Sequence, residues 1–87
     1  MTRERESLRG EQARRLLEDP LLQEAFTTVE MAVRDSWTAT TDEAIDERER
    51  LWLMLKLLGR VRTHLLTVVE TGKLAEAQIN LREQGSA

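Results

Sequence analysis

Residues 51–58, Leu51-Trp52-Leu53-Met54-Leu55-Lys56-Leu57-Leu58, are apolar at seven of eight positions and decide the fold. A helix that covers one small core needs an apolar stripe only about 100° wide. In a helix over residues 45–69, Trp52, Leu55 and Leu58 lie on one side, whereas Leu53, Met54 and Leu57 lie on another. This helix therefore has two packing surfaces, and the second is covered either by another helix of the same chain or by another copy of the chain.

The composition predicts one all-α domain. The 87 residues are 40% hydrophobic and 33% charged, with only three aromatic residues, which is typical of a solvated helical bundle. A monomer of this size buries only about 60% of its unfolded surface, so we expect help from oligomerisation. The absence of cysteine excludes disulfides and thiolate metal sites. Without a signal peptide or an apolar run of about 18 residues, we expect a soluble, cytoplasmic protein that makes no membrane contact.

Two helices are predicted in the first half of the chain. The first covers residues 2–18, with Thr2 as its N-cap, and is weakened at Gly10 by about 1 kcal/mol relative to alanine. Asp19 and Pro20 then provide an N-cap and a first helical residue for a second helix, which runs to about Trp37. Its apolar residues are spaced for packing against another helix: Leu22, Phe26, Val29, Val33 and Trp37.

The third helix is predicted to begin at Asp42, after a capping box formed by Thr40 and Glu43, and to end near Glu70 with Gly72 as the C′ residue. The short connection makes the second and third helices an antiparallel hairpin. Folding the chain about residues 40 and 41 predicts four pairs, with a close backbone approach at Gly59: Trp37 with Ile45, Val29 with Trp52, Phe26 with Leu55 and Leu22 with Gly59.

The chain thus divides into an N-terminal helical arm (1–19), a helical hairpin core (20–71) and an amphipathic tail (72–87). The third helix overhangs its partner, so its last turns need cover from the first helix or from other subunits. We predict that the second apolar side forms the interface of a homo-oligomer. Its residues are Leu53, Met54, Leu57, Val61, Leu65 and Val68.

Charge is segregated along the chain, although the net charge is only -3. Residues 18–49 hold ten acids and two arginines, whereas residues 50–64 hold four cations and no acid. Two explanations remain open: Arg60 and Arg62 face the acids Glu18, Asp19 and Glu24 across the hairpin, or the cations bind an anion. The candidates for contact with nucleic-acid phosphate are Arg3, Arg5, Arg9, Arg14, Arg15, Lys56 and Arg60.

We find no active site in the sequence, and we expect neither catalysis nor a cofactor. His64 is the only histidine and has no nearby carboxylate or nucleophile in sequence. The acids Asp42, Glu43, Asp46 and Glu47 suit the positive end of the third helix's dipole. Under the alternative of a metal-dependent nucleotide hydrolase, activity would be lost on Glu43→Ala or Glu47→Ala.

Four segments carry a resemblance to a known family: residues 16–26 (Leu-Leu-Glu-Asp-Pro-Leu-Leu-Gln-Glu-Ala-Phe), 37–40 (Trp-Thr-Ala-Thr), 48–52 (Arg-Glu-Arg-Leu-Trp) and 69–75 (Val-Glu-Thr-Gly-Lys-Leu-Ala). The chain resembles small helical packaging proteins of tailed bacteriophages and gene transfer agents, most of all the short small-terminase-like type. The resemblance implies a non-enzymatic oligomer, often a ring, that works in the bacterial host cytoplasm. Such a subunit recognises viral DNA and presents it to the large terminase subunit. This sequence lacks the family's N-terminal helix-turn-helix domain, so we expect only weak, nonspecific contact with double-stranded DNA.

The tail offers a docking segment for a partner such as the large terminase, because its residues repeat at helical spacing: Leu74, Ala77, Gln78 and Leu81. Equally, this segment could cover the core of its own chain. An alternative function is a phage-encoded helical interaction or regulatory module. It would bind a host or virion protein through the acidic residues 42–49.

Overall fold

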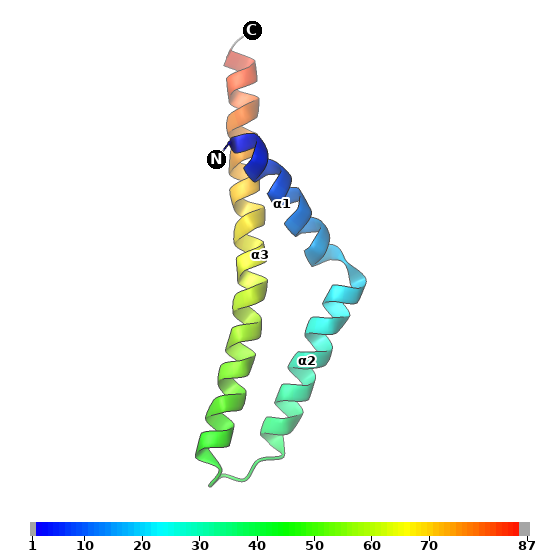
Figure 1. Cartoon of the computed structure of the whole chain (residues 1–87), viewed down its shortest axis with the longest axis vertical. Coiled ribbons are helices and arrows are strands. Elements are labelled where there is room, and N and C mark those ends of the chain that lie inside the picture. Colours follow the sequence, from blue (N-terminus) through cyan, green and yellow to red (C-terminus); the bar gives the residue numbers. More distant parts are fainter. Residues whose placement is uncertain (1, 86–87) are drawn as a thin grey trace.

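A computed structural model describes residues 2–85 and contains three helices: α1 (Arg3–Glu18), α2 (Pro20–Thr38) and α3 (Ile45–Gly85). No strand occurs in this range, so the predicted all-α class and long third helix are confirmed. Figure 1 shows α3 as the long axis, with α2 along its first half and α1 along its second half. The chain is elongated and measures 68 × 24 × 16 Å.

The starts of α1 and α2 are capped as predicted. The Thr2 hydroxyl accepts a hydrogen bond from the Arg5 backbone N–H at 3.1 Å. The Asp19 carboxylate accepts from the backbone N–H groups of Leu21 and Leu22 at 2.8 and 3.0 Å, and Pro20 is the first residue of α2. Because Asp19 alone separates the two helices, the chain changes direction there without a loop, and α2 runs on toward the start of α3 (Figure 1).

The predicted start of α3 is wrong by three residues. Instead of capping α3, the Thr40 hydroxyl donates to the Trp37 carbonyl at 2.6 Å and accepts from Arg48 at 3.0 Å. Residues 39–44 remain a turn, and α3 begins at Ile45. The longer connection changes which residues of the hairpin face each other.

The hairpin register therefore differs from the prediction, by three residues of α3 opposite Trp37 and by seven opposite Phe26. The Arg48 guanidinium, not Ile45, lies over the Trp37 ring at 3.7 Å from its centroid. Farther along, the Arg62 guanidinium lies 4.8 Å from the centroid of the Phe26 ring, at the place predicted for Leu55. No atom outside its own helix turn lies within 4 Å of a Cβ built at Gly59, so the predicted close approach there is also wrong.

Charges do bridge the hairpin, but through different partners from those predicted. Arg62 lies 3.0 Å from Glu30 in an ion pair between α3 and α2. Glu18 instead pairs with Arg14 inside α1, and Asp19 is used as the cap of α2. The shifted register explains the difference, because it places Arg62 next to the middle of α2 and not next to its first turn.

Close contact between backbones occurs where α1 crosses α3. A Cβ built at Gly72 would lie 2.7 Å from the Gly10 Cα and 3.0 Å from the Glu6 carbonyl oxygen. Gly72 therefore lies inside α3, and the predicted helix end at this residue is wrong. No glycine in residues 2–85 has a positive φ, so none adopts the left-handed conformation of a C′ residue. The missing side chain serves helix packing, not helix termination.

The core of the described chain is small. Four apolar residues are buried, and no large side chain in residues 2–85 is completely enclosed. Three of the four lie at the α1–α3 crossing and one lies between α2 and α3: Ala13, Val69, Ala75 and Val33. Most large apolar side chains therefore remain accessible.

Candidate interaction surfaces

An apolar stripe of α3, formed by Leu53, Met54, Leu57 and Val61, is open to solvent. These four side chains are between 46% and 56% exposed. Their spacing places them together on the side of the helix opposite Leu55, which faces α2. The stripe is the part of the predicted oligomer interface that the rest of the chain leaves uncovered.

The predicted interface residues Leu65 and Val68 lie in a different environment. Both are half-buried, because α1 crosses α3 at this level. Val68 shares a groove with Glu6 and Arg9 of α1. The first helix thus covers the last turns of the apolar side, as one of the two sequence-based alternatives proposed, and the open stripe ends at Val61.

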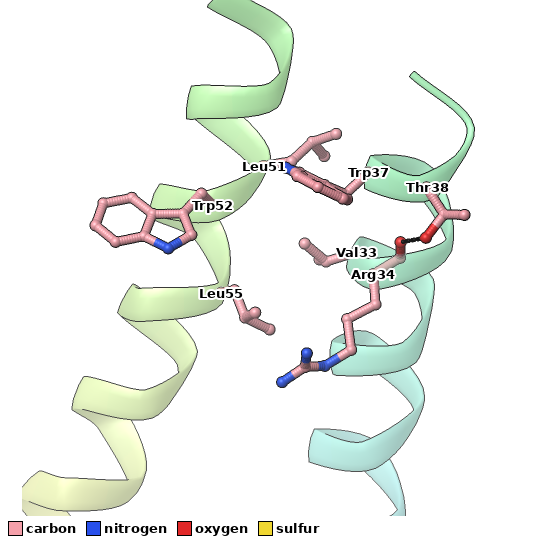
Figure 2. Close-up of a pocket in the computed structure, with 7 residues that line it drawn as sticks. All are labelled: Val33, Arg34, Trp37, Thr38, Leu51, Trp52 and Leu55. Atoms are coloured by element: carbon pink, nitrogen blue, oxygen red, sulfur yellow. Dashed lines mark hydrogen bonds between the residues drawn. The ribbon is translucent and has the colours of Figure 1, made fainter. Parts of the chain in front are cut away.

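A second apolar feature is the groove between the last turns of α2 and the first turns of α3, near the connection at residues 39–44, with a volume of about 430 Å³. Figure 2 shows Val33 and Trp37 of α2 facing Leu51 and Leu55 of α3, while the Trp52 ring lies to the side, away from α2. The guanidinium group of Arg34 reaches across the groove toward α3 (Figure 2). The site could hold an apolar side chain next to a carboxylate.

Several of the α1 arginines that were predicted to contact DNA instead form ion pairs or hydrogen bonds within the chain. Arg14 donates two hydrogen bonds to the Glu18 carboxylate at 2.9 and 2.7 Å and also donates to Glu11. Arg15 lies 3.6 Å from Glu11 in a further ion pair. Arg3 donates to Gln78 of α3 at 2.6 Å. These contacts spread the arginines over different sides of α1.

Other cations of the predicted DNA-binding set do form a row. Lys56, Arg60 and His64 follow one another at four-residue intervals on α3, and the groove beside His64 is lined by Arg9 of α1. The Lys56 ammonium lies 4.5 Å from the centroid of the Trp52 ring. Arg5 is exposed on α1. The structure therefore joins Arg9 to the cations of α3 at one edge of the apolar stripe.

Hydrogen bonds lower the pKa values of two carboxyl groups on α1. A hydrogen bond from Arg14 holds the pKa of Glu11 below its ordinary value, and hydrogen bonds to Glu11 and Glu18 raise the pKa of Arg14. At the start of α1, a backbone hydrogen bond and then one from Arg82 lower the pKa of Glu4. The Arg82–Glu4 contact, at 2.9 Å, ties the start of α1 to the last turns of α3.

The predicted tail is part of α3, which continues without interruption to Gly85. Leu74 and Leu81 are about two-thirds exposed, and Ala77 is also exposed. The fourth predicted docking residue, Gln78, accepts the hydrogen bond from Arg3. Residues 1, 86 and 87 of the predicted arm and tail lie outside the described residues.

The crossing of α1 and α3 was missed in the sequence, although a signal for it exists. Gly10 and Ala13 are three residues apart on α1, and Gly72 and Ala75 are three residues apart on α3. Small residues at this spacing form a flat strip that lets two helix backbones approach closely. Gly10 was interpreted as a destabilising residue of the first helix and Gly72 as the end of the third helix. The matching spacing of small residues in the two helices was therefore not recognised.

Within residues 2–85, no three histidine, cysteine, aspartate or glutamate side chains gather closely enough to hold a metal ion. No helix in the same range is both long enough and apolar enough to cross a membrane. Comparison with protein-family models, curated proteins and solved structures finds no match to this chain.

Proposed function

We propose that this protein is a non-enzymatic assembly subunit that associates with further copies of itself through the apolar stripe of α3. The observation that carries this proposal is the accessible surface of 6923 Å², in a chain of 10.1 kDa. A folded monomer of this mass exposes about 5,300 Å², so the surplus is roughly 1,600 Å². One standard interface removes about 800 Å² from each partner. Contacts between subunits would account for a surplus of this size.

We further infer, from the family resemblance, that the subunit acts in viral DNA packaging in the bacterial host cytoplasm and recruits the large terminase to DNA. Three features support this role. The stripe of α3 provides a surface for self-association, and the exposed Leu74 and Leu81 provide a separate one for a protein partner. The row of Lys56 and Arg60, extended by Arg9, can contact phosphates without reading sequence.

One observation favours a second function, that of an interaction module for a host or virion protein. The groove between α2 and α3 places Trp37, Leu51 and the guanidinium of Arg34 together near the connection that joins the two helices (Figure 2). A partner helix could insert an apolar side chain there and pair a carboxylate with Arg34. In that function the chain would be a monomer or dimer.

The deciding experiment is the solution mass of the full chain and of Leu53→Glu, measured by light scattering behind a sizing column at low and high salt. Leu21→Glu is the matched control, because Leu21 is exposed on α2, outside the stripe. We expect a multimer that Leu53→Glu dissociates and that Leu21→Glu leaves intact, with both variants equally helical. A monomeric wild-type chain, or a multimer that tolerates Leu53→Glu, would refute self-association through the stripe.

The packaging role is then tested on the intact multimer. Its binding to a double-stranded DNA fragment should weaken steeply as salt rises, because the contacts would be made to phosphates. Binding to the purified large terminase should persist in a buffer that removes DNA binding. A multimer that binds neither partner would leave self-association standing and refute the role in packaging.

A further inference from the structure

A row of uncharged residues on α2, formed by Ala25, Val29 and Ala32, is open to solvent. Val29 is 44% exposed, and both alanines are also exposed. Their spacing of four and three residues places them along one side of the helix. The charged residues of α2 lie elsewhere around the helix: Glu24, Glu30, Arg34 and Asp35.

The two grooves between α2 and α3 show on which side of the hairpin this row lies. Thr27 and Arg34 of α2 line these grooves together with Trp52 and Leu66 of α3, and they define the groove side of the hairpin. Each residue turns a helix by about 100°, so the row on α2 points away from Thr27 and Arg34. The residues of α3 that point away from Trp52 and Leu66 belong to the open stripe: Met54, Leu57 and Val61. The row and the stripe therefore lie on the same side of the hairpin, opposite the grooves.

The row and the stripe are also level with each other. The Arg62 guanidinium lies over the Phe26 ring, which fixes the position of α2 along α3. Val29 follows Phe26 by about one turn in the antiparallel hairpin, so it lies beside residues 57–61, next to the stripe. We call the combined surface the hairpin face. Its residues are Ala25, Val29 and Ala32 of α2 and Met54, Leu57 and Val61 of α3.

We propose that the hairpin face, and not the α3 stripe alone, is the surface on which a second copy of the chain packs. The inference rests on the proposed self-association and adds α2 to its interface. Val29 is enclosed between the two copies. Ala25 and Ala32 leave room for a helix of the second copy to approach, because the distance between packed helices depends on the side chains at the contact.

The area that a stable pair needs favours the two-helix surface. The stripe from Leu53 to Val61 covers about 12 Å of a helix about 10 Å wide, so it presents about 120 Å² in projection. The hairpin face, beside residues 51–65, covers about 21 Å of two helices and presents about 420 Å². A standard interface removes about 800 Å² of accessible surface from each partner. Projection leaves out the relief of the side chains, so accessible areas are larger, but only the hairpin face approaches the required size.

The distribution of charge favours a second copy as the occupant. In an isologous interface each patch meets itself, so a charged patch would repel its copy, whereas an uncharged apolar patch does not. The groove side of the hairpin holds the Arg62–Glu30 ion pair and the guanidinium of Arg34. Lys56 and Arg60 follow the outer edge of the stripe, where a polar rim is expected.

The first helix limits how the second copy can lie. α1 covers α3 at Val68 and Gly72, just beyond the hairpin face. A second copy aligned antiparallel would bring its turn at residues 39–44 against α1, and one aligned parallel would bring the two α1 helices together. Hairpins that cross at a steep angle, as in the common class of about 50°, avoid both contacts. The contact is then confined to the hairpin face.

Charges placed on α2 test this assignment. Sedimentation equilibrium would compare the dissociation constants of the wild type, Val29→Glu and Ala32→Glu, with Met31→Glu as the matched control. Met31 is 58% exposed and lies four residues after Thr27, on the groove side of α2. A carboxylate enclosed between two uncharged faces loses its hydration without gaining a partner, so both interface variants should associate at least about a hundredfold more weakly. Met31→Glu should remain within about threefold of the wild type.

The outcomes separate this inference from the proposed function. If Leu53→Glu dissociates the multimer but Val29→Glu or Ala32→Glu, when fully helical, matches Met31→Glu, self-association stands and the part assigned to α2 is refuted. Equal weakening by all three α2 variants also refutes it. A multimer that tolerates Leu53→Glu refutes both proposals. Circular dichroism verifies helicity, and Ala32→Glu keeps the test decisive if Val29→Glu folds poorly, because glutamate is a good helix former at an exposed position.

Discussion

Substituting Gly72 by alanine should loosen the crossing of α1 and α3. In an open helix interior, this substitution stabilises by about 1 kcal/mol, because alanine has the higher helix propensity. At Gly72 the new Cβ would lie 2.7 Å from the Gly10 Cα. Both neighbouring atoms, this Cα and the Glu6 carbonyl oxygen, belong to the backbone, so the clash is relieved only if α1 moves as a whole.

The expected size of the effect follows from these two opposing contributions. Overpacking a close contact costs about 1–3 kcal/mol, so the net change should be a loss of up to about 2 kcal/mol. The matched control is Gly59→Ala in the same helix, where a Cβ meets nothing within 4 Å. That variant should gain up to about 1 kcal/mol. The difference between the two variants isolates the contact, because the propensity gain is common to both.

Thermal unfolding monitored by circular dichroism at one fixed chain concentration measures this difference. For a domain of this size, 1 kcal/mol corresponds to about 4–8 °C in Tm. We expect Gly59→Ala to raise the Tm and Gly72→Ala to lower it. Equal increases in both variants would show that α1 does not cross α3 through these glycines.

Two further predictions concern the polar contacts of α1 and α2. Asp19→Ala removes the N-cap of α2 and should cost about 1 kcal/mol, measured by the same melts, whereas the exposed Asp35→Ala inside α2 should have little effect. Hydrogen bonds lower the pKa of Glu4 in the folded state, so its bond with Arg82 stabilises fully above the ordinary pKa of 4.5. This stabilisation should be lost as the pH falls through the lowered pKa, and the Tm difference between the wild type and Glu4→Gln should disappear in acid.

Local signals in the sequence predicted the helices and the first two caps. Thr2, Asp19 and Pro20 act within a few residues of their own positions, so their roles do not depend on tertiary structure. The register of the hairpin does depend on it. Thr40 bonds to the Trp37 carbonyl and to Arg48 in place of the predicted cap, and the later contacts of the hairpin are displaced by three to seven residues along α3.

The packing of α1 was the least predictable part of the fold. Gly72 carries the same local signal whether it ends a helix or allows a second helix to approach, and only the position of Gly10 distinguishes the two roles. Helical spacing predicted that Leu53 and Leu57 lie on a second apolar side of this helix, and both side chains are exposed.

The small core also has a thermodynamic consequence. Unfolding a single chain exposes less apolar surface than unfolding a compact domain of the same mass, so the heat-capacity change of a monomer's unfolding is smaller than usual. If pairing through α3 adds most of the buried apolar area, folding and association become one equilibrium, governed by mass action. The cell would then set the fraction of folded protein by the amount of chain it makes, and dilution would act as a denaturant.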